Sequence, residues 1–180
     1  MRYGASTFIW VSPFSNKTLN LLDKAKAFGF DILEICIEDP DTLDASSIRA
    51  HADKAGVALT ICGAFGPSRD LSSEQEEVRQ NGLTYLKRCI DFASLLGSPF
   101  VSGPMYAAVG NARMLGPAAR EAQWARAVAS LKTAAAYAAE RSVKLAIEPL
   151  NRFETDLVNT VDQGQTSAAR TLACSSTRFI

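Results

Sequence analysis

Histidine is nearly absent from this sequence, and no two of its cysteines have the close spacing of a metal-binding pair. The 180 residues contain one histidine, His51, and four cysteines without a CxxC motif, Cys36, Cys62, Cys89 and Cys174. A zinc site of the Cys/His kind needs several such ligands at short spacings, so the sequence predicts none. His51 lies among charged residues of an expected helix and is predicted to be a surface residue. The unpaired cysteines favour a protein kept in the reducing cytoplasm.

Net charge and long apolar runs are missing as well. Lysine plus arginine (19) balance aspartate plus glutamate (19), so the chain lacks the broad basic field that attracts nucleic acid. No apolar run approaches the roughly 20 residues of a membrane span, and the N-terminus has no apolar signal-peptide core. We therefore expect no nucleic-acid partner, no membrane partner and a cytoplasmic location. A DNA-repair endonuclease is disfavoured for the same reasons.

Hydrophobic residues make up 47% of the chain, which is enough for one domain with a sizeable core. Short apolar runs alternate with longer helical patterns, and this alternation predicts an α/β fold with parallel strands. The five runs are Ala5 to Trp10, Ile32 to Ile37, Ala58 to Cys62, Phe100 to Ser102 and Val143 to Glu148. The clearest helical stripe contains Val78, Tyr85, Leu86, Cys89, Ala93 and Leu96.

The joints between these elements carry residues suited to helix ends. Gly29, Gly56 and Gly97 each precede an expected strand, where a left-handed helix cap favours glycine, and Ser142 takes that place before the fifth strand. These positions support repeated β/α units.

Three helix starts are predicted from local motifs. Ser72 with Gln75 and Thr160 with Gln163 have the spacing of a capping box. Gly116-Pro117 is expected to open the fourth helix, because proline favours the first helical position.

The number of units indicates a partial barrel. A closed (β/α)8 barrel takes about 250 residues, or roughly 31 per unit, so this chain holds about five units. We predict a partial (β/α)8 TIM barrel over residues 1–165, followed by an aberrant C-terminal tail at 166–180. The longest loop, Gly103 to Gly116, follows the fourth strand and should lie at the functional face.

Glu148 is the main candidate for chemistry. It directly follows the apolar residues of the fifth strand, so its carboxylate should lie at the mouth of the barrel. A charge there is costly unless it is paired or bound to a metal. Its position alone leaves two interpretations open: an ion pair with Arg152, or a metal ligand.

Several segments resemble one known family. They are residues 6–10 (STFIW), 29–35 (GFDILEI), 102–106 (SGPMY) and 146–160 (AIEPLNRFETDLVNT). Together they are similar to the ketose 3-epimerases, which include the D-tagatose, D-psicose and L-ribulose 3-epimerases, within the xylose-isomerase-like TIM barrels. The Glu-Pro-Leu-Asn opening is shared with hydroxypyruvate isomerases, and the continuation Arg152-Phe153-Glu154 favours the epimerases.

This resemblance implies an isomerase that epimerises free ketoses at C3 through a cis-enediolate. It implies that Glu148 binds a divalent metal, Mn²⁺, Co²⁺ or Mg²⁺, and is one of two glutamates that exchange the C3 proton. Glu154 is expected to hydrogen-bond the sugar near its carbonyl end. Further residues expected to line the sugar pocket are Ser6, Trp10, Cys62, Ala64 and Val109. Core packing is an equal alternative for Trp10 and Cys62, and Glu34 is either an inward carboxylate or part of an internal salt bridge.

The sequence also departs from the family. The resemblance places the other metal ligands on strands six to eight, as an aspartate, a histidine and a glutamate, and none has a counterpart in the 180 residues. The tail resembles a truncated or frame-shifted sequence, so we expect weak or no manganese binding and no epimerisation by this chain alone. Alternatives are a hydroxypyruvate isomerase or inosose dehydratase relative, or a non-catalytic fragment that associates through unpaired strand edges. A homo-oligomer is left open.

Overall fold

The computed structural model of this chain describes residues 1–165; the predicted tail at 166–180 lies outside the described residues. The strands are β1 (Gly4–Ser6), β2 (Ile32–Ile37), β3 (Ala58–Gly63), β4 (Phe100–Gly103) and β5 (Lys144–Ile147). The α-helices are α1 (Asn20–Ala27), α2 (Ala45–Ala55), α3 (Glu76–Leu96) and α4 (Pro117–Ala139). Short 3₁₀ helices span η1 (Thr7–Ile9), η2 (Asn16–Thr18), η3 (Pro40–Thr42) and η4 (Pro67–Arg69).

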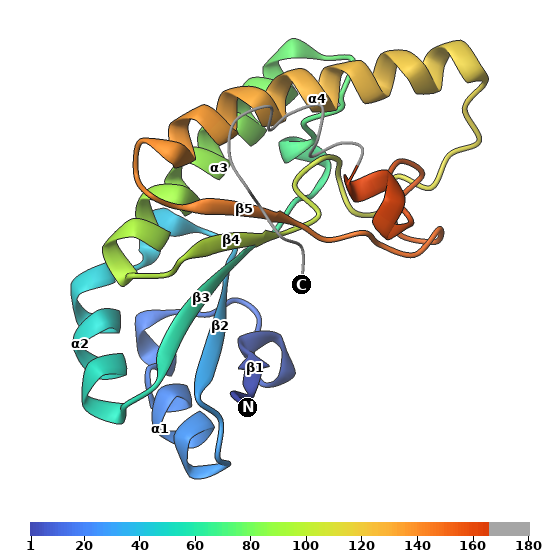
Figure 1. The fold of residues 1–180 in the computed structure, drawn as a ribbon. Coiled ribbons are helices and arrows are strands. Elements are labelled where there is room, and N and C mark those ends of the chain that lie inside the picture. The colour runs from blue at the N-terminus through green and yellow to red at the C-terminus, as the bar shows by residue number, and fades with distance from the viewer. Residues whose placement is uncertain (166–180) are drawn as a thin grey trace.

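The sheet has the topology of a barrel wall. Its five strands are all parallel and lie side by side in the order β1-β2-β3-β4-β5. The four α-helices lie on one side of the curved sheet (Figure 1). A doubly wound sheet would reverse its strand order part-way and carry helices on both faces. Sequential order with one-sided helices is therefore the arrangement of a partial (β/α)8 barrel, as the sequence predicts.

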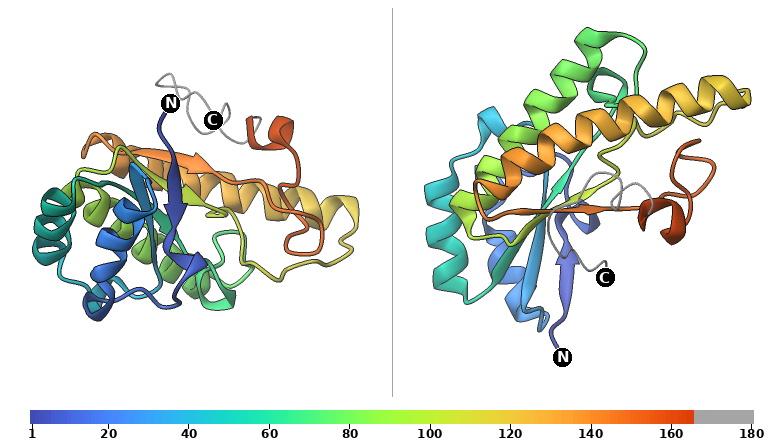
Figure 2. Two further views of the ribbon diagram at one scale, coloured as in Figure 1. Left: turned by 90° about the horizontal axis from the view of Figure 1, so that it is seen from below. Right: turned by 45° about the horizontal axis from the view of Figure 1, so that its top comes forward.

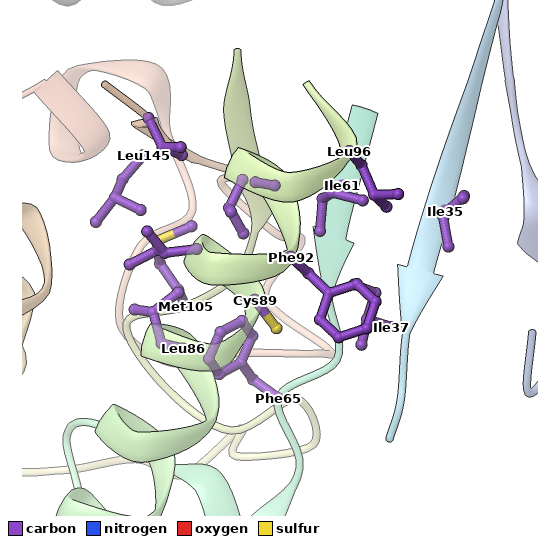
Figure 3. Packing of buried hydrophobic residues seen from close by; sticks show 14 of the residues in the cluster. Ile35, Ile37, Ile61, Phe65, Leu86, Cys89, Phe92, Leu96, Met105 and Leu145 are labelled. Atoms are coloured by element: carbon purple, nitrogen blue, oxygen red, sulfur yellow. The ribbon is translucent and has the colours of Figure 1, made fainter. Parts of the chain in front are cut away.

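Helix α3 forms much of the core against the sheet. Leu86, Cys89 and Phe92 of this helix belong to one buried cluster with Ile37 of β2 and Ile61 of β3, and Figure 3 shows Phe92 beside Ile37 in that cluster. Cys89 and Leu86 are completely buried. The predicted stripe of α3 is confirmed, because all of its members are buried except the half-buried Val78. Alternate strand residues face α3, which leaves the residues between them on the opposite, inner face of the sheet.

The predicted helix ends are confirmed by their backbone angles. Gly29, Gly56 and Gly97 have φ values of 85°, 67° and 70°, and Ser142 has a φ of 56°. All four residues therefore adopt the left-handed conformation that ends a helix before the next strand.

The first strand is shorter than the apolar run predicted. β1 ends at Ser6, and the chain turns into η1, because the Ser6 hydroxyl accepts a hydrogen bond from the Phe8 N–H at 3.4 Å. Thr7 then interrupts the strand ladder, since its hydroxyl accepts from the N–H of Cys36 at 3.1 Å. Ile9 consequently lies exposed rather than in the sheet.

One of the three helix-start predictions is wrong. Helix α3 has Gln75 at its N-cap without a side-chain cap, and Ser72 is buried and bonds to Asp70 at 2.6 Å instead. The box of Thr160 and Gln163 is confirmed by reciprocal bonds of 3.2 and 3.1 Å. Helix α4 begins with proline after Gly116, as expected.

The carboxyl ends of β3 and β4 approach closely. Gly103 has a φ of 127°, and a Cβ at this position would lie 2.9 Å from the main-chain oxygen of Gly63. Glycine is required there by both conformation and space. The loop that follows β4 meets the segment after β5, where Asn111 and Thr155 form a parallel bridge; the views in Figure 2 show these segments side by side.

Candidate functional site

A cavity of about 860 Å³ opens at the carboxyl ends of the strands. Its walls come from β1, β2 and β3 and from the segments that follow each of the five strands. The lining residues are Ser6, Phe8, Glu34, Glu38, Cys62, Gly63, Ala64, Phe65, Gly66, Ser68, Arg69, Pro104, Val109, Glu148, Leu150 and Glu154. This volume and this position are typical of a small-molecule site in a barrel fold.

The structure brings together six of the seven site residues predicted from the sequence. Those that line the cavity are Ser6, Cys62, Ala64, Val109, Glu148 and Glu154. Trp10 is not among the lining residues: it stacks on Phe28 with ring centroids 6.3 Å apart, and the Lys24 ammonium lies 5.2 Å from its ring centre.

His51 also lies apart from the cavity. It is on helix α2, is partly exposed and pairs with Asp23 at 2.8 Å. The structure therefore places it at the surface, as predicted.

Glu148 is positioned by its main chain. Its N–H donates to the Gly103 carbonyl at 3.1 Å, which continues the β4–β5 pairing by one residue. Its carbonyl accepts from the hydroxyl of Tyr106 at 3.1 Å. Tyr106 is almost fully buried and also contacts the Val158 carbonyl at 3.0 Å and the Leu150 N–H at 3.3 Å. This one phenol therefore ties the end of β5 to the loop that follows it.

The carboxylate of Glu148 is not neutralised by Arg152. Within residues 1–165 no ion pair joins the two, and the guanidinium of Arg152 lies over the exposed ring of Phe153, 5.2 Å from its centre. Desolvation raises the pKa of Glu148 above its ordinary value, and the charges of Glu34 and Glu154 raise it further. Of the two interpretations that the sequence left open, the structure does not support the ion pair.

Glu154 is held by its own turn. The side-chain amide of Asn151 donates to its carboxylate, and its N–H donates to the Asn151 carbonyl at 3.0 Å. Its carbonyl accepts from the N–H of Gly110 at 2.7 Å, so the turn is joined to the loop after β4. The half-buried carboxylate of Glu154 thereby reaches the same cavity as Glu148.

The cavity carries an excess of negative charge. Four glutamates line it, at positions 34, 38, 148 and 154, against one arginine, Arg69. The guanidinium of Arg69 is engaged with the main chain, since it donates to the carbonyls of Glu38 at 2.8 Å and Ala64 at 3.3 Å and stacks 3.9 Å from the Tyr85 ring centre. Carboxylate oxygen is a suitable ligand for a hard divalent ion, so a cavity lined by four glutamates offers possible ligands to such an ion.

Glu38 and Arg69 are lining residues that the sequence interpretation missed. Glu38 directly follows β2, as Glu148 directly follows β5, so the same strand-end rule could have found it. Arg69 lies in η4 and has no comparable sequence signal.

Glu34, Cys36 and Cys62 form a second polar group at the base of the cavity. The Ser102 hydroxyl donates to the Glu34 carboxylate at 3.0 Å, and the Ser6 hydroxyl lies 3.4 Å from the Cys36 sulfur. A hydrogen bond from Cys62 lowers the pKa of the Cys36 thiol, while that bond and burial raise the pKa of Cys62. No salt bridge involves Glu34 within residues 1–165, which leaves the inward carboxylate as the interpretation that the structure supports.

A family model described as Xylose isomerase-like TIM barrel matches residues 22–170. The match covers most of the chain, and the protein therefore belongs to this family.

The chain is also similar to proteins that are named ketose or L-ribulose 3-epimerases. The chain is 31% identical over 164 residues to a probable ketose 3-epimerase of Synechocystis sp., covering 91% of this chain and 56% of that protein. It is 29% identical over 164 residues to the L-ribulose 3-epimerase of Mesorhizobium japonicum, with 91% and 54% covered. A solved structure of L-ribulose 3-epimerase matches with a TM-score of 0.84 and 29% identity over 94% of this chain and 57% of that chain. The resemblance to isomerases of the ketose 3-epimerase kind is confirmed.

The chain spans a little over half the length of these relatives. None of the helices within residues 1–165 combines the length and apolar character that a membrane span requires.

Proposed function

We propose that this protein contributes to the metal-dependent epimerisation of a free ketose at C3. The observation that carries the proposal is that Glu148 and Glu154 both reach one cavity at the strand ends, together with Ser6, Cys62, Ala64 and Val109. The relatives named for ketose and L-ribulose 3-epimerisation support this reaction class. The proposed partner is therefore a small-molecule ketose.

Glu148 is the proposed base that exchanges the C3 proton. A carboxylate that removes a proton next to a carbonyl works best when its pKa lies nearer to neutral than that of an ordinary glutamate. The raised pKa of Glu148, caused first by desolvation, moves it in that direction. Loss of the C3 proton gives a planar cis-enediolate, and return of a proton to the opposite face inverts C3. The resemblance assigns this second acid to a strand outside residues 1–165.

Glu148 is also the residue of this chain that would hold the divalent ion, Mn²⁺, Co²⁺ or Mg²⁺. Such an ion, when bound, stabilises negative charge at the C2 and C3 oxygens of the sugar. The fit rests on the excess of carboxylates in the cavity and on their oxygen ligands. Glu154, fixed by Asn151, is proposed to orient the carbonyl end of the sugar through a hydrogen bond.

Two further properties are proposed. Cys36, Cys62 and Cys89 are free thiols, which favours a cytoplasmic protein. The strands β1 and β5 each pair on one side only within the described sheet, which favours self-association.

The reaction is tested by joining residues 1–165 to the remaining strands of the Mesorhizobium japonicum L-ribulose 3-epimerase. With Mn²⁺ this chimera should interconvert ketoses that differ at C3, and Glu148→Gln should lower turnover by about 10²-fold or more. Glu140→Gln, an exposed carboxylate at the end of α4, is the matched control. A folded chimera whose turnover is unaffected by Glu148→Gln would contradict the proposal. The 180-residue chain alone should bind Mn²⁺ weakly and give no turnover.

A further inference from the structure

Two cysteines and a glutamate converge on the inner face of the sheet. Glu34 and Cys36 are two residues apart on β2 and so point to the same side, and Cys36 is paired in register with Cys62 of β3. Glu34 and Cys62 line the cavity, which fixes this side as the inner face. One ligand atom from each of the three residues lies within 4.8 Å of the other two.

These distances fit the coordination sphere of a thiophilic metal ion. A tetrahedral zinc centre has metal–sulfur bonds of about 2.3 Å and metal–oxygen bonds of about 2.0–2.2 Å, which set its ligand atoms roughly 3.4–3.8 Å apart. Because the three ligand atoms already lie within 4.8 Å of one another, closing the group to that size takes shifts of about 1 Å or less, which side-chain rotation can supply. Two sulfur ligands select zinc, cadmium and similar ions over manganese or magnesium.

The surroundings of the group also favour a cation. Within residues 1–165 the Glu34 carboxylate forms no ion pair, and it accepts a hydrogen bond from the neutral hydroxyl of Ser102 at 3.0 Å. Arg69, the cationic lining residue, is turned to the carbonyls of Glu38 and Ala64. A half-buried carboxylate beside two buried thiols therefore offers a divalent ion one oxygen and two sulfur ligands.

We propose that Glu34, Cys36 and Cys62 form a binding site for a thiophilic divalent cation such as Zn²⁺ or Cd²⁺ at the base of the cavity. The site is separate from Glu148, whose carboxylate is not part of the group. Because Glu34 and Cys62 line the cavity, the fourth coordination position faces it and is filled by water or by a sugar hydroxyl. This inference does not depend on the proposed epimerase reaction.

The test is a titration of the reduced, metal-free 180-residue chain with Cd²⁺, followed through the ultraviolet charge-transfer band of cadmium thiolates. One equivalent should saturate the band. Cys36→Ser and Cys62→Ser should each halve its amplitude and weaken the Kd by more than about tenfold, because each removes a metal ligand. Cys89→Ser, which changes a buried core thiol outside the group, and Cys174→Ser are the matched controls.

Glu34→Gln should weaken the Kd while keeping the full band, and Glu148→Gln should leave the band unchanged. The latter result separates this site from the proposed manganese ligand. Circular dichroism establishes that each variant is folded.

A measurement on the unaltered chain gives an independent check. Zn²⁺ should slow the alkylation of Cys62 by iodoacetamide, mapped by mass spectrometry, and Mn²⁺ should not. The proposal is overturned if no saturable band forms or if both serine variants retain it. A Cys36–Cys62 disulfide that survives reductant would overturn it as well.

Discussion

Replacing Tyr106 by phenylalanine removes one hydroxyl and leaves the rest of a buried ring in place. That hydroxyl lies 3.1 Å from the Glu148 carbonyl, 3.0 Å from the Val158 carbonyl and 3.3 Å from the Leu150 N–H. The Leu150 N–H keeps a second acceptor in the Val158 carbonyl at 3.1 Å, so the Glu148 carbonyl loses most. Tyr106 is only 1% exposed, and this burial raises its pKa to about 12.

The expected cost follows from those contacts. A lost hydrogen bond costs about 1 kcal/mol net, and a partly buried carbonyl left without a donor adds up to about 1 kcal/mol, so Tyr106→Phe should lower the free energy of unfolding by about 1–2 kcal/mol. Urea denaturation at neutral pH measures this value. Hydrogen exchange should show faster opening at Leu150 than in the unaltered chain, because the turn after β5 is no longer tied to Tyr106.

Tyr137→Phe is the matched control. Its hydroxyl bonds to the carboxylate of Asp91 at 2.9 Å on the partly exposed outer side, so this change should cost less than about 1 kcal/mol and leave the Leu150 amide unaffected. Two results would refute the stabilising role of the Tyr106 hydroxyl. One is that both substitutions lower the free energy of unfolding equally, and the other is that Tyr106→Phe is as stable as the unaltered chain.

Four further results are expected. Gly103→Ala should lower the free energy of unfolding by about 1–3 kcal/mol in urea titrations, because of its φ and the close Gly63 carbonyl, whereas Gly116→Ala, with open space around it, should change it by less than about 0.5 kcal/mol. Glu148 has a raised pKa, so the folded chain binds more protons than the unfolded chain above pH 4.5 and loses stability as pH rises through that window. Metal-free Glu148→Gln should therefore be more stable than the unaltered chain at pH 7, by less than about 1 kcal/mol because this side chain is partly exposed to solvent. Denaturation at several pH values should show that this difference in the free energy of unfolding shrinks as the pH is lowered. Asp156→Ala should lower the free energy of unfolding, measured by thermal denaturation, by about 2–3 kcal/mol, because the buried carboxylate accepts hydrogen bonds from Arg113 at 3.0 Å and Gln123 at 2.9 Å. A loss below about 1 kcal/mol would show that these hydrogen bonds do not stabilise the fold. In gel filtration the purified chain should elute above its monomer mass, and a compact monomer would contradict association through the edges of β1 and β5.

The strand ends were the part of the site that the sequence predicted well. Glu148 ends the fifth apolar run, so the parallel-strand rule places it at the cavity, whereas Glu154 was placed there by the family resemblance alone. The helix ends at Gly56 and Gly97 were equally predictable, because their left-handed conformation is a local property of the chain.

Long-range contacts were not predictable in the same way. Cys36 and Cys62 carry no motif, and only the register between β2 and β3 makes them neighbours. Tyr106 and Arg69 act through carbonyls of distant segments, which sequence patterns do not report. The length of the first strand was overestimated because its apolar run continues to Trp10, whereas hydrogen bonds to the Ser6 and Thr7 hydroxyls turn the backbone out of the sheet after Ser6.

Within residues 1–165, each strand of the sheet pairs with its neighbours along the chain. Chains fold from the N-terminus as they are synthesised, and each strand here pairs with one that has already been made. The wall that carries Ser6, Cys62 and Glu148 could thus assemble on the ribosome unit by unit, and the ligand cavity would be shaped while translation is still under way.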